Sequence, residues 1–312
     1  MRRLVVLTLL AACAATEVAE TPTEVALRAR HAEALGDWRH AAELWLSLHD
    51  GDDPAAARGL ARALDAWGDA MGALRVLDSV EVVSPKLLLD RGALQAHLGQ
   101  VELAVESLRE ACALDTGSVE ARARLGELLL RLDRPQEALV VLREAIALEP
   151  GDASLRRQFK VAARRTGARE EERGAYLALA DLSALGFEEA LAFAQLSLED
   201  PAHQAAAAEW LAAGLERDPS RGDGWRVMAL LLERLGDEEG RLAALRATLE
   251  MDPADRATLL TLAGARAARG EWEAVEVLAD HARTLGDAEL VERIEALLAG
   301  REEEREEDGE TD

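Results

Sequence analysis

The chain has 312 residues and a formal net charge of −24, so its length allows two ordinary domains or one extended array. Such an acidic chain lacks the basic surface that sequence-independent nucleic-acid binding requires, which excludes that class of function. Hydrophobic residues make up 49% and aromatic residues 3%, and the predominance of Ala, Leu, Arg and Glu favours helix throughout.

The first thirteen residues have the order of a bacterial export signal. Met1–Arg3 are positively charged, Leu4–Leu10 form an apolar stretch, and the letters LAAC end at Cys13. This order resembles the lipobox of bacterial lipoprotein signal peptides. The resemblance implies that residues 1–12 are a signal peptide and that the Cys13 thiol becomes joined to diacylglycerol.

In this interpretation residues 13–21 form a tether between the anchor and the folded body. Two or three acyl chains give stable membrane attachment, and the tether reaches at most about 30 Å. Ala14 follows the cysteine, which favours the outer membrane, with the protein facing the periplasm. The alternative is an unprocessed N-terminus on a soluble cytoplasmic protein. Past residue 12, no stretch approaches the length of a membrane span.

A unit of about 34 residues recurs along the chain. Residues 119–152 show it most clearly, with Gly126, Ala138, Ala145 and Pro150 at regular spacing. This spacing resembles the tetratricopeptide repeat, a helical hairpin with small residues at unit positions 8, 20 and 27 and proline at position 32.

The same frame fits eight units, which begin near residues 22, 54, 85, 119, 153, 188, 222 and 256. Glycines at the predicted turn, unit position 15, are Gly36, Gly68, Gly99, Gly167, Gly236 and Gly270. Prolines that close units are Pro85, Pro150, Pro219 and Pro253. Alanines at position 20 are Ala41, Ala73, Ala104, Ala138 and Ala207.

The residue types in this frame have physical reasons. Small side chains let the two helices of a hairpin approach closely, and glycine permits the backbone of the turn. A single hairpin leaves an apolar face exposed, so its stability comes from stacking on neighbours. We therefore expect an all-α fold, an α-solenoid of about eight tetratricopeptide-like hairpins over residues 22–286, wound as a right-handed superhelix.

Three segments depart from the regular frame. Residues 166–190 contain extra glycines and place Glu172 where alanine is expected, so this stretch is either a drifted repeat or a bend between two blocks of units. Residues 287–300 are amphipathic and predict a cap helix, which such arrays require. Residues 301–312 hold eight acidic residues and two arginines, and predict a disordered tail.

No catalytic motif emerges from the sequence. The segment His49–Pro54 contains metal-ligand residue types but lies in the link between two units, where a polar turn is the better interpretation. Cys112 follows a small residue in a second helix and is interpreted as a buried structural thiol. The sequence therefore predicts no enzyme, no metal, no cofactor and no small-molecule substrate. An enzyme whose site lies in the irregular stretch, residues 166–190, would require a departure from the repeat frame there.

The remaining candidate site is a groove. In the resembled repeats, unit positions 2, 5, 9, 12 and 13 of the first helices line the concave side. In units two to five these positions carry seven cationic residues, Arg58, Arg62, Lys86, Arg131, Arg157, Arg164 and Arg165. The carboxylates there are Asp65, Glu120 and Glu127. Guanidinium groups in such a groove could hold an acidic peptide segment or a terminal carboxylate. The alternative is that arginine is simply abundant on solvated helix faces.

Taken together, these patterns predict a membrane-anchored scaffold that binds a partner protein or peptide in its groove within a bacterial cell envelope. The alternative is a soluble cytoplasmic adaptor of the same fold.

Overall fold

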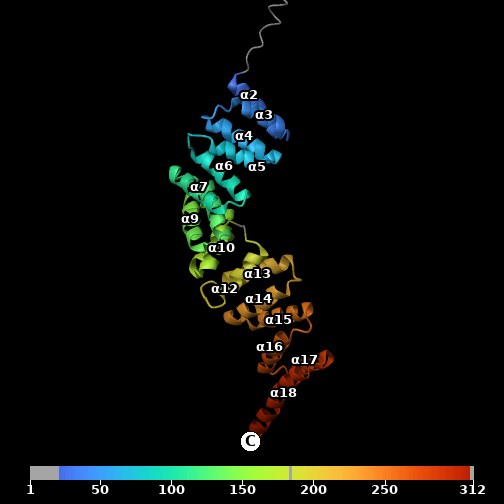
Figure 1. Ribbon diagram of the computed structural model, residues 1–312. Coiled ribbons are helices and arrows are strands. Elements are labelled where there is room, and N and C mark those ends of the chain that lie inside the picture. The colour runs from blue at the N-terminus through green and yellow to red at the C-terminus, as the bar shows by residue number, and fades with distance from the viewer. Residues whose placement is uncertain (1–20, 183–184, 310–312) are drawn as a thin grey trace, which may run out of the picture. The chain divides into compact units, whose positions relative to one another are not determined.

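The computed structural model describes residues 21–182 and 185–309, and within these ranges it consists of seventeen α-helices with no β-strand (Figure 1). The prediction of an all-α array of helical hairpins is confirmed. Residues 1–20, which include the predicted signal peptide and Cys13, lie outside the described residues.

The predicted units begin where first helices begin, to within one residue. The first helices are α2 (Pro22–Ala34), α4 (Pro54–Trp67), α6 (Pro85–His97), α8 (Val119–Arg131), α10 (Ala153–Thr166), α12 (Phe187–Ser197), α14 (Gly222–Leu235) and α16 (Arg256–Ala268). The second helices are α3 (Trp38–Leu48), α5 (Ala70–Asp78), α7 (Val101–Leu114), α9 (Pro135–Leu148), α11 (Arg169–Asp181), α13 (Gln204–Arg217), α15 (Glu238–Met251) and α17 (Trp272–Leu285). The last helix is α18 (Ala288–Gly309).

The chain divides into two compact units, residues 1–167 and 168–312, here called the N-terminal and C-terminal units. Seven of the predicted hairpins pack as pairs, from α2 with α3 to α16 with α17. The helices of the fifth unit behave differently, because α10 packs against α9 in the N-terminal unit and α11 packs against α12 in the C-terminal unit. The boundary lies where the repeat frame is poorest, and a bend there stays a prediction.

Seven of the eight turns from a first helix to the second helix of its unit use left-handed backbone, and the α12–α13 link is the exception. All six predicted turn glycines have positive φ angles, between 71° and 104°. In the fourth hairpin the same place is occupied by Asp133, which also has a positive φ of 55°. Glycine adopts this conformation without the steric cost that a Cβ atom brings, which explains its use at the other turns.

Close helix approach depends on the small residues of the frame. The five alanines predicted at position 20 are all fully buried. At position 8 of the fourth unit, a Cβ atom on Gly126 would lie 2.5 Å from the Leu142 side chain of α9. Glycine there lets α8 and α9 pack closer than alanine would allow.

In the C-terminal unit an aromatic side chain fills the space that two glycines leave. Phe187, the first residue of α12, fits against two glycines, since Cβ atoms on Gly214 and Gly224 would each lie within 2.9 Å of its ring. Its ring also carries the Arg221 guanidinium 4.1 Å from its centre. Tyr176 of α11 packs on Phe193 of α12, with ring centroids 5.7 Å apart.

Two details differ from the sequence analysis. Pro85 was assigned to the end of a unit, but it is the first residue of α6, a position that proline favours because its missing N–H has no helical partner there.

Helix α18 packs on α16 and α17 through Leu290 and Ile294, as a cap should, but continues to Gly309 through most of the expected disordered tail. Glutamate and arginine are good helix formers, so a helix already begun can extend into that stretch.

Candidate binding face

The first helices of the N-terminal unit contact one another in sequence, α4 with α6, α6 with α8 and α8 with α10. We call the surface that α2, α4, α6, α8 and α10 present at unit positions 2, 5, 9, 12 and 13 the first-helix face. Two pockets open on this face, and most of these unit positions in units one to four line them.

The first pocket, of about 580 Å³, lies between α2, α3 and α4. Its walls combine apolar and charged side chains, and they include Ala26, Arg30, Glu33, Trp45, Leu48, Ala55, Arg58 and Arg62. Glu33 accepts a 2.6 Å hydrogen bond from the indole N–H of Trp45 and lies 3.5 Å from Arg62. Arg30 is exposed and makes no ion pair with the described residues.

The second pocket, of about 400 Å³, lies between α6 and α8. The small residues Gly92, Ala93 and Ala96 of α6 line one side of it. Its polar wall carries His97, Arg124, Glu127 and Arg131. Arg124 is paired with Glu120 at 2.8 Å, and His97 lies 3.2 Å from Asp65. Arg131 is exposed and has no ion-pair partner in the described part of the chain.

The structure brings some predicted groove cations into ion pairs between neighbouring units. Arg58 Nε lies 2.6 Å from Asp90 of α6, and Arg62 lies 3.5 Å from Glu33 of α2. Arg165 lies 3.9 Å from Asp133 of the preceding unit and also donates a 2.6 Å hydrogen bond to the carbonyl of Leu130. These pairs reduce the positive surplus that the sequence analysis expected for this face.

The other predicted cations remain at the surface. Lys86 is exposed at the start of α6, and Arg157 and Arg164 are exposed on α10, where each makes a further contact within the chain. Arg131 and Arg30 are therefore the clearest anchoring points for an anion on the described first-helix face.

The sequence analysis missed the carboxylates that neutralise this face. Asp90 stands at unit position 6, which is outside the projected groove positions, and Glu33 belongs to the first unit, which was not projected. The sequence spacing of these charges could have predicted the pairs. Arg58 precedes Asp90 by 32 residues, and Glu33 precedes Arg62 by 29 residues. Opposite charges spaced by about one repeat face each other when first helices stack.

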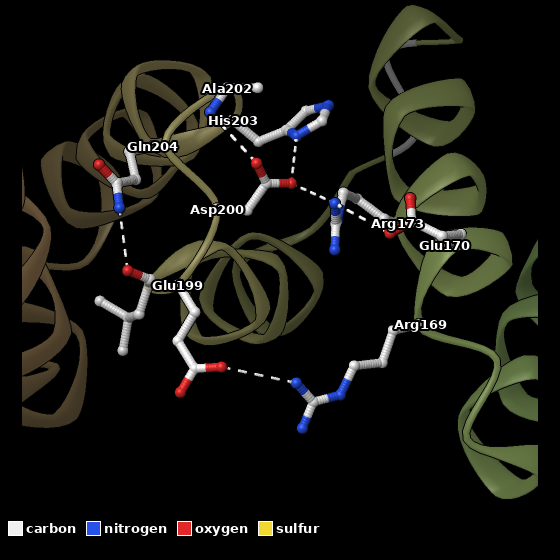
Figure 2. A network of polar contacts seen from close by, with 9 residues as sticks. Arg169, Glu170, Arg173, Glu199, Asp200, Ala202, His203 and Gln204 are labelled. Carbon is white, nitrogen blue, oxygen red and sulfur yellow. Dashed lines mark hydrogen bonds and ion pairs between the residues drawn. The ribbon is translucent and has the colours of Figure 1, made fainter.

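The C-terminal unit holds a separate polar network (Figure 2). Asp200, in the link between α12 and α13, contacts Arg173 of α11, lies 2.8 Å from Nδ1 of His203 and accepts the N–H of Ala202. Nearby, Arg169 of α11 lies 3.6 Å from Glu199. The hydrogen bond from His203, with further help from Ala202 and Arg173, holds the pKa of Asp200 below its ordinary value. The network joins α11 to the following hairpin.

The His49–Pro54 segment and Cys112, the two candidates for a metal site or a reactive thiol, both have structural roles. Asp50 accepts hydrogen bonds from the N–H groups of Asp52 and Asp53, so the stretch after His49 forms a polar turn between α3 and α4. These bonds lower the pKa of Asp50. Cys112 is half-buried, and burial raises the pKa of its thiol, which keeps it protonated and unreactive.

The described residues offer neither a metal site nor a membrane-spanning helix. No group of three or more His, Cys, Asp or Glu side chains there is placed to hold a metal ion. Among the same residues, no helix combines the length and the apolar character that crossing a bilayer demands.

Comparison with known proteins agrees with this fold. Residues 95–160 match the family model described as tetratricopeptide repeat. A solved structure of the C-terminal part of a TPR repeat-containing protein from Cytophaga hutchinsonii is 14% identical, covers 74% of this chain and 96% of that chain, and gives a TM-score of 0.56. The fold is therefore that of a tetratricopeptide-repeat array.

Other solved structures resemble the chain less closely. A tetratricopeptide repeat protein from Parabacteroides merdae is 14% identical, covers 77% of this chain and 97% of that chain, and has a TM-score of 0.48. The MamA protein is 18% identical, covers 51% of this chain and 90% of that chain, and has a TM-score of 0.46. No curated protein matches the sequence.

Proposed function

We propose that this chain is a scaffold that binds a partner protein or peptide on the first-helix face and is anchored through a lipid on Cys13 in a bacterial cell envelope. The observation that carries the binding proposal is the pair of pockets on one face of stacked first helices. Arrays of this kind offer extended surfaces that a partner chain can follow.

An acidic segment is the partner that this face suits best. Arg30 lines the first pocket and Arg131 lines the second. Neither side chain forms an ion pair with the described residues. Each can form two parallel hydrogen bonds with a carboxylate. Apolar walls at Trp45 and Leu128 would take the neighbouring side chains. Charge complementarity would then set the partner's identity and association rate more than its affinity.

Charge reversal tests the binding proposal. Arg30, Arg62 and Arg131, which line the two pockets, are changed together to Glu, and capture of the native partner from membrane extracts is measured by quantitative mass spectrometry. We expect the reversal to abolish capture, because it replaces attraction for a carboxylate by repulsion. The matched control changes Arg39, Arg75 and Arg109 to Glu, three exposed arginines on second helices. Unchanged capture by the first variant, or equal loss in both, contradicts the proposal.

The anchor is tested separately by the mass of the mature N-terminus. Protein purified from bacterial membranes should begin at Cys13 and carry acyl chains, and a Cys13→Ala variant should lose both the acyl mass and the membrane fraction. An unmodified chain that begins at Met1 in the soluble fraction would instead support the alternative, a soluble cytoplasmic adaptor.

A scaffold is also favoured over an enzyme hidden in the irregular stretch. Most of residues 166–190 is helical, because α11 spans Arg169–Asp181 and α12 begins at Phe187. The side chains in this stretch are used for packing and for the network around Asp200.

A further inference from the structure

A pocket of about 200 Å³ opens in the C-terminal unit, where the second half of α13 lies beside α12 and the end of α11 (Figure 1). Every residue that lines it is apolar except Arg217, and no carboxylate belongs to the lining. The pocket is in the other unit from the first-helix face, and the proposed function does not use it. Its binding chemistry therefore depends on two parts, an apolar interior and a single cation.

The interior of the pocket has room for one ring-sized apolar group. Ala190 and Gly214 are buried in its lining, and their small size leaves the space open. Leu185, Phe187 and Trp210 are half-buried and also line it. An apolar cavity of about 150 Å³ already holds benzene, so this pocket accepts a phenyl ring with a short chain. The rings of Phe187 and Trp210 offer such a group edge or face contacts.

The two aromatic side chains of the lining are held in place by contacts outside the pocket. The Arg221 guanidinium lies 4.1 Å from the centre of the Phe187 ring and is itself paired with Glu188 at 2.8 Å. The ring centroid of Trp210 lies 4.8 Å from that of the buried Phe193. A ligand therefore meets aromatic walls that are already ordered, and binding loses little conformational entropy there.

Arg217 gives the pocket its one charged group. Its side chain is exposed and makes no ion pair with the described residues, and its Nε–H donates a 3.1 Å hydrogen bond to the carbonyl of Ala213. That bond leaves the two terminal nitrogens of the guanidinium for a ligand. A carboxylate is the group that accepts hydrogen bonds from such a pair of nitrogens most favourably.

The carboxylates near this pocket in the sequence have other contacts or point elsewhere. Glu189 of α12 accepts the N–H of Gly186 at 3.1 Å and caps its own helix. Asp218 accepts hydrogen bonds from the N–H and O–H of Ser220. Glu216 is exposed, and neither it nor Asp218 forms an ion pair with Arg217. The charge of Arg217 is therefore available to a ligand anion.

We infer that this pocket binds a small free carboxylic acid with an aromatic body, such as an arylpropanoate. The ring lies against Phe187 and Trp210, and the carboxylate pairs with Arg217. A free acid of this size satisfies the apolar interior and the single cation at once. An amide or an amine of the same shape satisfies only the apolar interior, so the pocket selects the acid.

The test uses the full chain and para-fluorophenylpropanoate, whose binding is followed by fluorine NMR relaxation of the ligand. Para-fluorophenylpropanamide is the matched comparison, because it has the same shape and no charge. We expect the acid to bind at least threefold more tightly than the amide, since a hydrogen bond to a charged group is stronger than one to a neutral group. The ionic strength is about 0.15 M, where distant charges of the chain are screened.

Substitution of the arginine tests the charge. Arg217→Gln should remove the preference, so that the acid and the amide bind equally. The matched control is Arg293→Gln, which changes an exposed arginine of α18 and should keep the preference of the wild type. A preference for the acid that survives Arg217→Gln unchanged would contradict the inference.

Substitution of an alanine tests the location. Ala213→Leu places a larger side chain in the lining and should weaken both ligands at least fivefold. Ala206→Leu, at a half-buried alanine of the same helix outside the lining, should leave both affinities unchanged. Circular dichroism checks that each variant keeps its helix content, and the Arg217 variant decides the question if either leucine variant does not fold.

Three further results would overturn the inference. These are no binding of the acid, equal affinity of the acid and the amide for the wild type, and equal weakening by the two leucine variants. A short peptide that ends in para-fluorophenylalanine with a free carboxylate provides the last comparison. If this peptide binds more tightly than the propanoate, the pocket is a site for the C-terminus of a protein and the inference of a small-molecule site is wrong.

Discussion

Gly126 lies where α8 approaches α9 most closely, and a Cβ atom at this position would be 2.5 Å from Cδ2 of Leu142. Leu142 is fully buried and cannot move without disturbing its neighbours. We expect Gly126→Ala to lower the free energy of unfolding by about 1–3 kcal/mol, the usual cost of overpacking a core. Urea denaturation followed by circular dichroism measures this change.

The matched control is Gly264→Ala in the interior of α16. A Cβ atom there would meet no other atom within 4 Å, so alanine should stabilise the helix by about 0.5–1 kcal/mol through its better helix propensity. If both substitutions shift the urea midpoint in the same direction, the close approach of α8 and α9 does not determine the choice of glycine.

Asp133 is the one residue besides glycine with a positive φ in the described part of the chain. The left-handed conformation costs an L-residue about 1–2 kcal/mol, and the higher unfolded-state entropy of glycine offsets part of any gain from replacing it. Asp133 is 90% exposed and 3.9 Å from Arg165, so that ion pair contributes little.

We therefore expect Asp133→Gly to raise the free energy of unfolding by about 0.5 kcal/mol. Asp133→Ala keeps the unfavourable backbone and should be less stable than the wild type. Thermal unfolding of the three proteins checks the order, and an alanine variant at least as stable as the glycine variant would refute it.

At the level of helices, the attachment of α11 depends on an ionised Asp200. Contacts with His203, Ala202 and Arg173 hold the pKa of Asp200 below its ordinary value, which is about 3.9 in an unfolded chain. A lowered pKa in the folded state means that the stabilisation is fully present above about pH 4 and is lost as the pH falls through the lower value. Acid should therefore weaken the link between α11 and the α12–α13 hairpin.

Asp200→Asn should lower the urea midpoint at pH 7, and its difference from the wild type should shrink below about pH 4. The control is Asp181→Asn, which changes an exposed carboxylate at the end of α11 and should have little effect at any pH. A difference that persists unchanged into acid would mean that the loss of stability in the variant does not come from the charge of Asp200.

The elements themselves could be predicted well from the sequence. Helix starts follow from glycine, alanine and proline at fixed unit positions, because each of these residues answers a local backbone or packing requirement. The left-handed backbone at Asp133 was not predicted, because no glycine occupies that turn. The helical end of the chain was missed because charge density alone predicted disorder for residues that are also good helix formers.

At the scale of the whole molecule, the two compact units should respond separately to local damage. Gly126→Ala disturbs the N-terminal unit, and Gly214→Ala would press a Cβ atom to 2.8 Å from Phe187 in the C-terminal unit. We expect hydrogen exchange to accelerate mainly within residues 22–167 for the first variant and within residues 168–299 for the second. Equal acceleration in both ranges would show that the array opens as one cooperative body.

The candidate site was harder to predict than the fold. The positions that face the groove follow from the repeat frame, and the two pockets fall on them. The charge of the face depends on pairs between units, such as Arg58 with Asp90, and these require knowing which helices stack. The division at residue 167 falls in the stretch where the repeat frame is poorest, but the packing of α11 with α12 instead of α10 does not follow from that local pattern.

The contacts between α4 and α6 also have a practical use. Arg58 meets Asp90, and Asp65 meets His97, each pair spanning 32 residues. Two such contacts fix how far one helix slides along the other, whatever the length of the chain that joins them. The exposed residues Glu81–Val83, between α5 and α6, are therefore a suitable place to graft a reporter peptide, because the alignment of α4 and α6 does not depend on them and the buried Val80 and the capping Ser84 on either side stay in place.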